Sequence, residues 1–84
     1  MKLSAEVSRT QQSIRYNRMT PGGNRIPTAV NKAIIAPAAQ GGVTLQYVDD
    51  IGEVLDTKEC VDTIAAKKLA LNELQIQEGQ WTPA

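Results

Sequence analysis

Residues 43–56, VTLQYVDDIGEVLD, decide the predicted fold. Apolar and polar side chains alternate through residues 43–48, which is the period of a half-buried β-strand. Residues 49–52 follow as a turn, because aspartate tolerates turn conformations and glycine adopts a positive φ at little cost. Residues 53–56 are therefore expected to return antiparallel and to complete a β-hairpin.

A long helix is expected after this hairpin, over residues 57–78. Asp56 or Thr57 is placed to cap its first turn, and Glu59 completes the form of a capping box with Asp56. Gly79 is a natural stop signal at the other end. A helix of this length would measure about 33 Å, so it would run the whole length of so small a domain.

The apolar residues of this helix form two stripes on its surface. One stripe holds Cys60, Ile64, Leu71 and Leu74, and the other holds Val61, Ala65, Leu69 and Ile76. The rest of the chain can cover one stripe. We expect a second subunit or a different protein to cover part of the other, which makes the second stripe the predicted partner-binding surface. The alternative is that residues 28–36 cover it.

The N-terminal half carries weaker signals. Residues 4–18 are expected to form a marginal helix with a thin apolar stripe, capped by Ser4. The Pro-Gly-Gly sequence at residues 21–23 is expected to end this helix and to leave an open segment. Residues 28–36 are expected to form a short helix that ends at Pro37. The predicted architecture is a small single α+β domain: N-terminal helix, Pro/Gly-rich open segment, short helix, β-hairpin and long C-terminal helix.

Charge divides the 84 residues into the same two segments. Residues 1–42, the basic and partly extended N-terminal segment with its one marginal helix, carry six basic residues against Glu6, or +5. Residues 43–84, the hairpin and long helix that form the folded core, carry three lysines against eight acidic residues, or −5. Such asymmetry is typical of a basic arm that meets an acidic surface or a nucleic acid.

The basic side chains have three candidate partners: the acidic half of the same or a neighbouring chain, an acidic surface of another protein, or phosphate groups. Tyr16 is available to stack on a base in the last case. The Pro-Gly-Gly segment lacks the glycine spacing of a phosphate-binding loop. The candidate contact residues are Arg9, Arg15, Arg18, Arg25 and Lys32.

The composition argues against an enzyme. The chain has no histidine, the usual acid–base group near neutral pH, and its single cysteine excludes an intramolecular disulfide and the usual zinc ligand sets. Asp49 and Asp50 are assigned to the turn, and residues 49–56 do not fit the spacing of a calcium loop. Cys60 is assigned to the core. We expect no catalytic residue, no metal and no cofactor.

Two further features bear on location and partners. No basic region joined to an apolar run indicates a signal peptide, and no segment approaches the ~20 apolar residues of a membrane span. We therefore expect a cytoplasmic protein, or one held within an assembly such as a virion, with no membrane contact. Trp81, the only tryptophan, either anchors a partner through the C-terminal tail or folds back onto the domain's own core.

In outline, the predicted helix, hairpin and helix resemble the small head-to-tail joining proteins of lambda-type tailed phages, over residues 43–74. The turn DDIGEV at residues 49–54, leading into a helix, is also similar to the flagellar FlaG family. No functional residue is transferred from either family. We expect a non-enzymatic structural or adaptor protein that acts through protein–protein contacts and self-association, such as a minor component of a bacteriophage particle or other bacterial assembly. The alternative is a small regulator that binds nucleic acid through its basic half.

Overall fold

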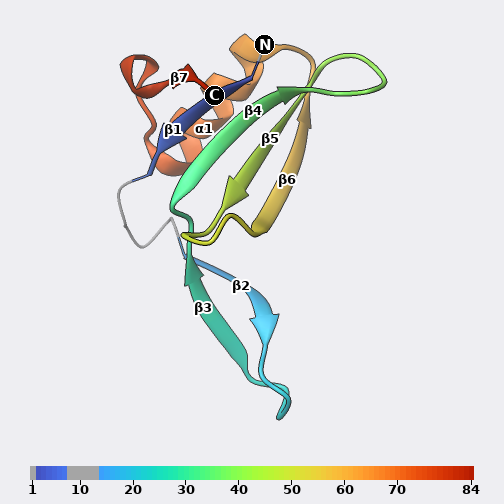
Figure 1. Cartoon of the computed structure of the whole chain (residues 1–84), viewed down its shortest axis with the longest axis vertical. Coiled ribbons are helices and arrows are strands. Elements are labelled where there is room, and N and C mark those ends of the chain that lie inside the picture. Colours follow the sequence, from blue (N-terminus) through green and yellow to red (C-terminus); the bar gives the residue numbers. More distant parts are fainter. Residues whose placement is uncertain (1, 8–13) are drawn as a thin grey trace.

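The fold is a five-stranded antiparallel β-sheet with one helix on one face and a two-stranded hairpin projecting from one end (Figure 1). The computed structural model describes residues 2–7 and 14–84, and for residues 14–19 and 25 it describes the backbone. The strand order in the sheet is β6-β5-β4-β1-β7. The longest dimension of the molecule, 40 Å, runs along the projecting hairpin.

The elements follow one another with short connections. The sheet strands are β1 (Leu3–Glu6), β4 (Lys32–Pro37), β5 (Val43–Val48), β6 (Val54–Cys60) and the two-residue β7 (Thr82–Pro83). The projecting hairpin consists of β2 (Ile14–Met19) and β3 (Arg25–Ala29). The helix α1 covers Thr63–Leu74, and a 3-10 turn covers Glu78–Gln80.

The predicted strand at residues 43–48 and its antiparallel return are confirmed. β5 pairs with β6 from Val43 opposite Cys60 to Val48 opposite Val54. The turn between them contains Gly52 at φ 87°. It is held by the buried Asp49, whose Oδ1 accepts hydrogen bonds from the amides of Ile51 at 3.1 Å and Glu53 at 2.8 Å. Aspartate therefore has the predicted turn-forming role.

The predicted N-terminal helix is wrong. Residues 3–6 form β1 and residues 14–19 form β2, while residues 8–13 of the predicted helix lie outside the described residues. Strand pairing explains the difference, because β1 is hydrogen-bonded on both sides, to β4 and to β7. The apolar stripe of the predicted helix was too thin to stabilise a helix against these partners.

The predicted short helix over residues 28–36 is also wrong. This stretch ends β3 and forms most of β4, in which Ala33 and Ile35 are buried and alternate with partly exposed neighbours. β4 lies in the middle of the sheet between β1 and β5. Both of its edges therefore find backbone partners, which outweighs the local helical spacing.

The C-terminal helix is shorter than predicted. The sheet register carries β6 through Cys60, so the first residues assigned to the helix belong to a strand. Asp62 caps the helix by accepting a hydrogen bond from the amide of Ala65 at 2.8 Å. At the other end Gln75 adopts a left-handed conformation, φ 58°, which stops the helix four residues before Gly79.

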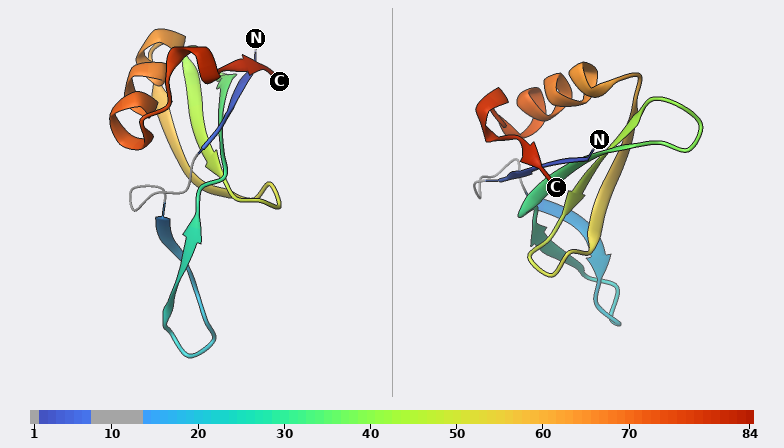
Figure 2. Two further views of the ribbon diagram at one scale, coloured as in Figure 1. Left: turned by 90° about the vertical axis from the view of Figure 1, so that its left-hand side faces the viewer. Right: turned by 45° about the horizontal axis from the view of Figure 1, so that its top comes forward.

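The core lies between α1 and one face of the sheet, as both views in Figure 2 show. The helix presents its small side chains, Ala66 and Ala70, to the sheet, and both are fully buried. Small residues let the helix approach the strands closely. The largest fully buried side chains are Tyr47 and Leu45 of β5, Ile35 of β4, and Val30, which lies between β3 and β4.

Candidate functional site

The β2–β3 hairpin, residues 14–29, projects from the sheet as an arm (Figures 1 and 2). Within the described part of the chain it pairs with no third strand. Its tip is a turn in which the amide of Thr20 donates to the carbonyl of Asn24 at 2.7 Å and the amide of Gly23 donates to that of Thr20 at 2.9 Å. An isolated two-stranded hairpin is only marginally stable in water, so a surface that covered the arm would stabilise it.

The arm is basic. Its register places Arg15 opposite Thr28, Arg18 opposite Ile26, and Arg25 opposite Met19. No acidic residue occurs anywhere between Glu6 and Asp49. The arm therefore carries a formal charge of +3 from its three arginines, with no acidic residue on the arm to neutralise it.

The other two predicted basic contacts lie elsewhere. Lys32 belongs to the sheet, where its Nζ lies 3.9 Å from Oε1 of Glu6 on the neighbouring strand. Arg9 lies outside the described residues. The fold thus brings together Arg15, Arg18 and Arg25 and separates Lys32 from them.

The predicted helix stripe is divided by the fold. Val61 is exposed ahead of α1, Ala65 and Leu69 are half-buried on α1, and Ile76 is buried after the helix ends. The large apolar side chains that α1 does expose are Ile64 and Leu71, which are 77% and 42% accessible. They were assigned to the other stripe, because the pattern of apolar residues did not reveal that Ala66 and Ala70 face the sheet.

A groove runs beside α1 and the C-terminal segment and has a volume of about 330 Å³. Ile64 and Leu71 form its helical side, and Ile76 and Trp81 contribute from the C-terminal segment. Its remaining lining residues are Thr63, Lys67, Lys68 and Glu78. The combination of an apolar floor with charged margins is typical of a protein-docking groove.

Trp81 packs in the core of its own domain and is 91% buried. Of the two interpretations of the tail, the structure therefore has the indole folded back onto the sheet and helix. Its Nε1–H is buried, and no acceptor within the described residues receives its hydrogen bond.

A chain of polar contacts fastens α1 to the sheet. The fully buried Tyr47 donates from its hydroxyl to Oε1 of Glu73 at 2.7 Å. Oε2 of Glu73 lies 3.2 Å from Nζ of Lys58, which lies 4.0 Å from Asp56. These contacts give the network a structural role in holding α1 to the sheet.

A second and larger hollow, about 860 Å³, opens between the β4–β5 loop and the end of β6. It is lined by residues 37–44 and by Glu59, Cys60 and Val61. The lining residue with the most nucleophilic side chain is Cys60, through its thiol. Among the described residues, no three histidine, cysteine or acidic side chains gather closely enough to hold a metal ion.

Cys60 is expected to react slowly at neutral pH. Burial raises the pKa of its thiol above the ordinary value, the Lys58 ammonium partly opposes that rise, and the Asp62 and Glu73 carboxylates add to it. Alkylation by iodoacetamide should therefore have a pH midpoint above the ~8.5 of a free cysteine, as followed by mass spectrometry with a short cysteine peptide as control. A midpoint below that of the peptide would contradict this assignment.

The same shift has a consequence for stability. The folded Cys60 thiol holds its proton more tightly than the unfolded one. Its contribution to folding stability is therefore fully present below the pKa of the unfolded thiol, and it is lost as pH rises through the pKa of the folded thiol.

Comparisons with protein-family models, curated proteins and solved structures found no match to this chain. The expected resemblance to a helix-hairpin-helix arrangement does not hold, because the strands β3 and β4, and not a helix, precede the β5–β6 hairpin. Over the described residues, no helix has the length and apolar character needed to cross a membrane. The arm and the groove are therefore the surfaces on which a functional assignment rests.

Proposed function

We propose that this chain is a non-enzymatic structural or adaptor protein that uses its basic arm to hold an acidic surface of a protein partner. In this proposal the five-stranded sheet supports the arm, and the arm contacts the neighbouring protein. Such a chain would be a minor component of a phage particle or other bacterial assembly. The sequence contains no histidine, and among the described residues no three histidine, cysteine or acidic side chains lie close enough to hold a metal ion.

The observation that carries this proposal is the arm itself. A two-stranded hairpin with three arginines extends away from the sheet and shares no strand pairing with it. Arginine is favoured at interfaces because its planar guanidinium binds carboxylates in a bidentate manner. A partner that covers the arm would both order it and neutralise its charge.

Affinity purification from the native source tests the proposal. The wild-type chain is expected to retain a protein partner in fixed proportion after nuclease treatment, and the triple variant R15E/R18E/R25E should lose it. The matched variant R15K/R18K/R25K keeps the charge and should retain the partner with reduced affinity. The proposal fails if the charge-reversed chain retains the same partner in the same amount.

A second candidate function rests on the shape of the arm. The major groove of B-DNA admits a two-stranded β-ribbon, and the arm is such a ribbon with a formal charge of +3. In this alternative the chain is a small regulator that binds nucleic acid. The same purification distinguishes the two functions, because nuclease treatment would release whatever the arm holds through nucleic acid.

For the nucleic-acid alternative we expect a defined salt dependence. Three arginine–phosphate contacts predict that the logarithm of the binding constant falls with the logarithm of salt concentration at a slope of about −3. Fluorescence anisotropy with labelled duplex DNA measures this slope. A slope near zero, or binding that R15E/R18E/R25E leaves unchanged, excludes the alternative.

A further inference from the structure

Apart from Val61, which lies ahead of α1 and outside the groove, large apolar side chains are exposed at two separate places on the sheet-and-helix body. At the β5–β6 turn, Ile51 is 76% and Val54 is 45% accessible. On α1, Ile64 and Leu71 are exposed along the groove described above. In Figures 1 and 2 the β5–β6 turn lies at the end of the sheet from which the arm projects, away from α1. One chain therefore cannot bring its own turn to its own groove.

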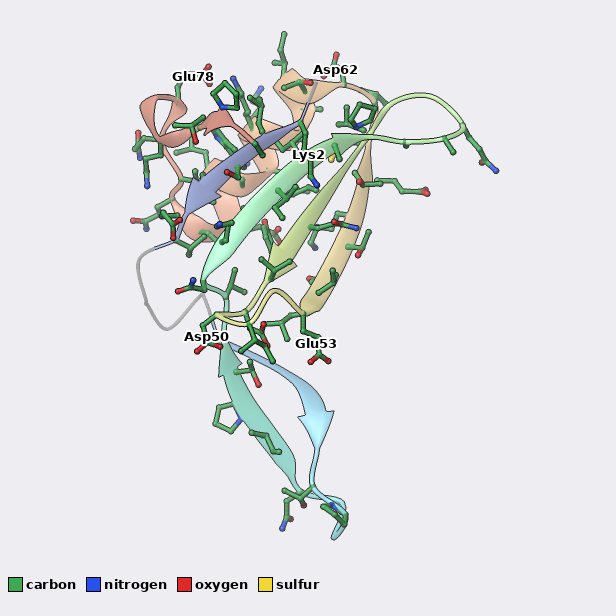
Figure 3. The ribbon with its side chains drawn as sticks, viewed as in Figure 1. Lys2, Asp50, Glu53, Asp62 and Glu78 are labelled. Carbon is green, nitrogen blue, oxygen red and sulfur yellow. The ribbon has the colours of Figure 1, made fainter. Side chains whose placement is uncertain are left out.

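The two places have opposite charge. The turn carries Asp50 and Glu53, both exposed, on either side of Ile51 (Figure 3). The groove carries Lys67 and Lys68 against Glu78, which pairs with Lys67 at 2.7 Å. Lys68 is exposed and has no ion-pair partner among the described residues. The groove therefore has a net positive charge and an apolar floor. The turn, at the other end of the sheet-and-helix body, has a negative charge and an apolar side chain at its tip.

Hydrogen bonds within the β5–β6 turn fix its conformation. Asp49 fixes it with the two backbone hydrogen bonds described above, and the Asp49 amide donates to the carbonyl of Glu53 at 3.0 Å. Ile51 is therefore held outward before any partner arrives, and little conformational entropy is lost on docking.

We propose that the acidic β5–β6 turn of one copy docks in the α1 groove of a second copy. Ile51 occupies the apolar floor beside Ile64 and Leu71, and the carboxylates of Asp50 and Glu53 lie near Lys68. The contact joins two different surfaces, so it is head-to-tail. Such contacts propagate into a closed ring or an open filament, depending on the rotation between copies.

This self-association is independent of the arm, which remains free for the partner proposed above. A failure of one proposal is therefore distinguishable from a failure of the other. The triple arm variant R15E/R18E/R25E should self-associate like the wild type, because none of its substitutions lies in the turn or the groove.

Sedimentation equilibrium of the pure chain tests the proposal. The wild type is expected to show an average mass that rises with concentration above the 9.1 kDa of the monomer. I51K and L71E each remove an apolar contact and set a like charge against the opposite surface, so each should weaken association by at least about tenfold. Both positions are exposed, and circular dichroism should show that both variants keep the wild-type fold.

A mixture of the two variants gives the decisive result. I51K retains an intact groove and L71E retains an intact turn, so mixing them should produce a one-to-one dimer that grows no further. V61E is the matched control, because Val61 is apolar and, at 82% accessible, more exposed than Leu71 at 42%, but lies outside the groove; V61E should associate like the wild type. The proposal is overturned by a wild type that stays monomeric at millimolar concentration, by association that neither variant weakens, or by a mixture that fails to form the dimer.

Discussion

Replacement of Gly42 by alanine is expected to lower the free energy of unfolding by about 3 kcal/mol. A Cβ atom at this position would lie 2.6 Å from the carbonyl oxygen of Cys60, and Gly42 has a φ of 71°. The positive φ costs an L-residue about 1–2 kcal/mol, and displacing a well-packed neighbour adds about 1–3 kcal/mol. The obstructing atom is backbone at the end of β6, so no side-chain rotation can relieve the contact.

Gly41 supplies the control. It also has a positive φ, 95°, but no atom lies within 4 Å of a Cβ built there. Gly41→Ala should therefore show only the conformational cost, about 1–2 kcal/mol. Urea unfolding of both variants measures the difference. If the two substitutions cost the same, the close approach of the β4–β5 loop to Cys60 is absent from the protein in solution.

The β5–β6 hairpin was predictable because the sequence signals that specify it lie within the hairpin itself. Alternation through residues 43–48 and a turn with aspartate and glycine at the required places specify two neighbouring strands without reference to the rest of the chain. The extent of β6 was not predictable in the same way. Its pairing with Val43 carries it through Cys60, a residue that also fits a helical period with Ile64.

The N-terminal strands depend on partners that are remote in sequence. Ser4 pairs with Ile34 on one side and with Thr82 on the other. Residues 3–7 contain too few apolar positions to separate a period of two from a period of 3.6. Only the completed sheet decides between them, and local propensity is a weak guide when pairing supplies most of the stability.

The interaction surfaces were partly visible in the sequence. The three arginines of the arm were identified, but the Pro-Gly-Gly segment was interpreted as a break, whereas it forms the tip of a hairpin. A turn sequence between the runs that form β2, six residues, and β3, five residues, was the signal that could have indicated this. The groove was not visible, since α1 turns its alanines inward and exposes Ile64 and Leu71. A pattern of apolar and polar residues does not distinguish a small apolar side chain from a large one.

Replacement of Tyr47 by alanine is expected to have the largest effect on stability, about 4 kcal/mol. The ring is fully buried in the middle of the core, where β5 faces α1, and the hydroxyl reaches Glu73 of the helix at 2.7 Å. The substitution removes the packing of the ring and leaves the carboxylate of Glu73 with Lys58 alone among the hydrogen-bond and ion-pair partners described for it. A domain of this size has a total stability on the order of 4–12 kcal/mol, so Tyr47→Ala should remove about a third or more of it, which urea unfolding measures.

Tyr47→Phe separates the two contributions. It keeps the ring and removes only the hydroxyl, so it should cost about 1–2 kcal/mol. The loss should shrink in the Glu73→Gln background, because the neutral amide is a weaker acceptor than a carboxylate. A double-mutant cycle by urea unfolding measures this coupling. Additive losses at the two positions would show that the hydroxyl does not bind Glu73.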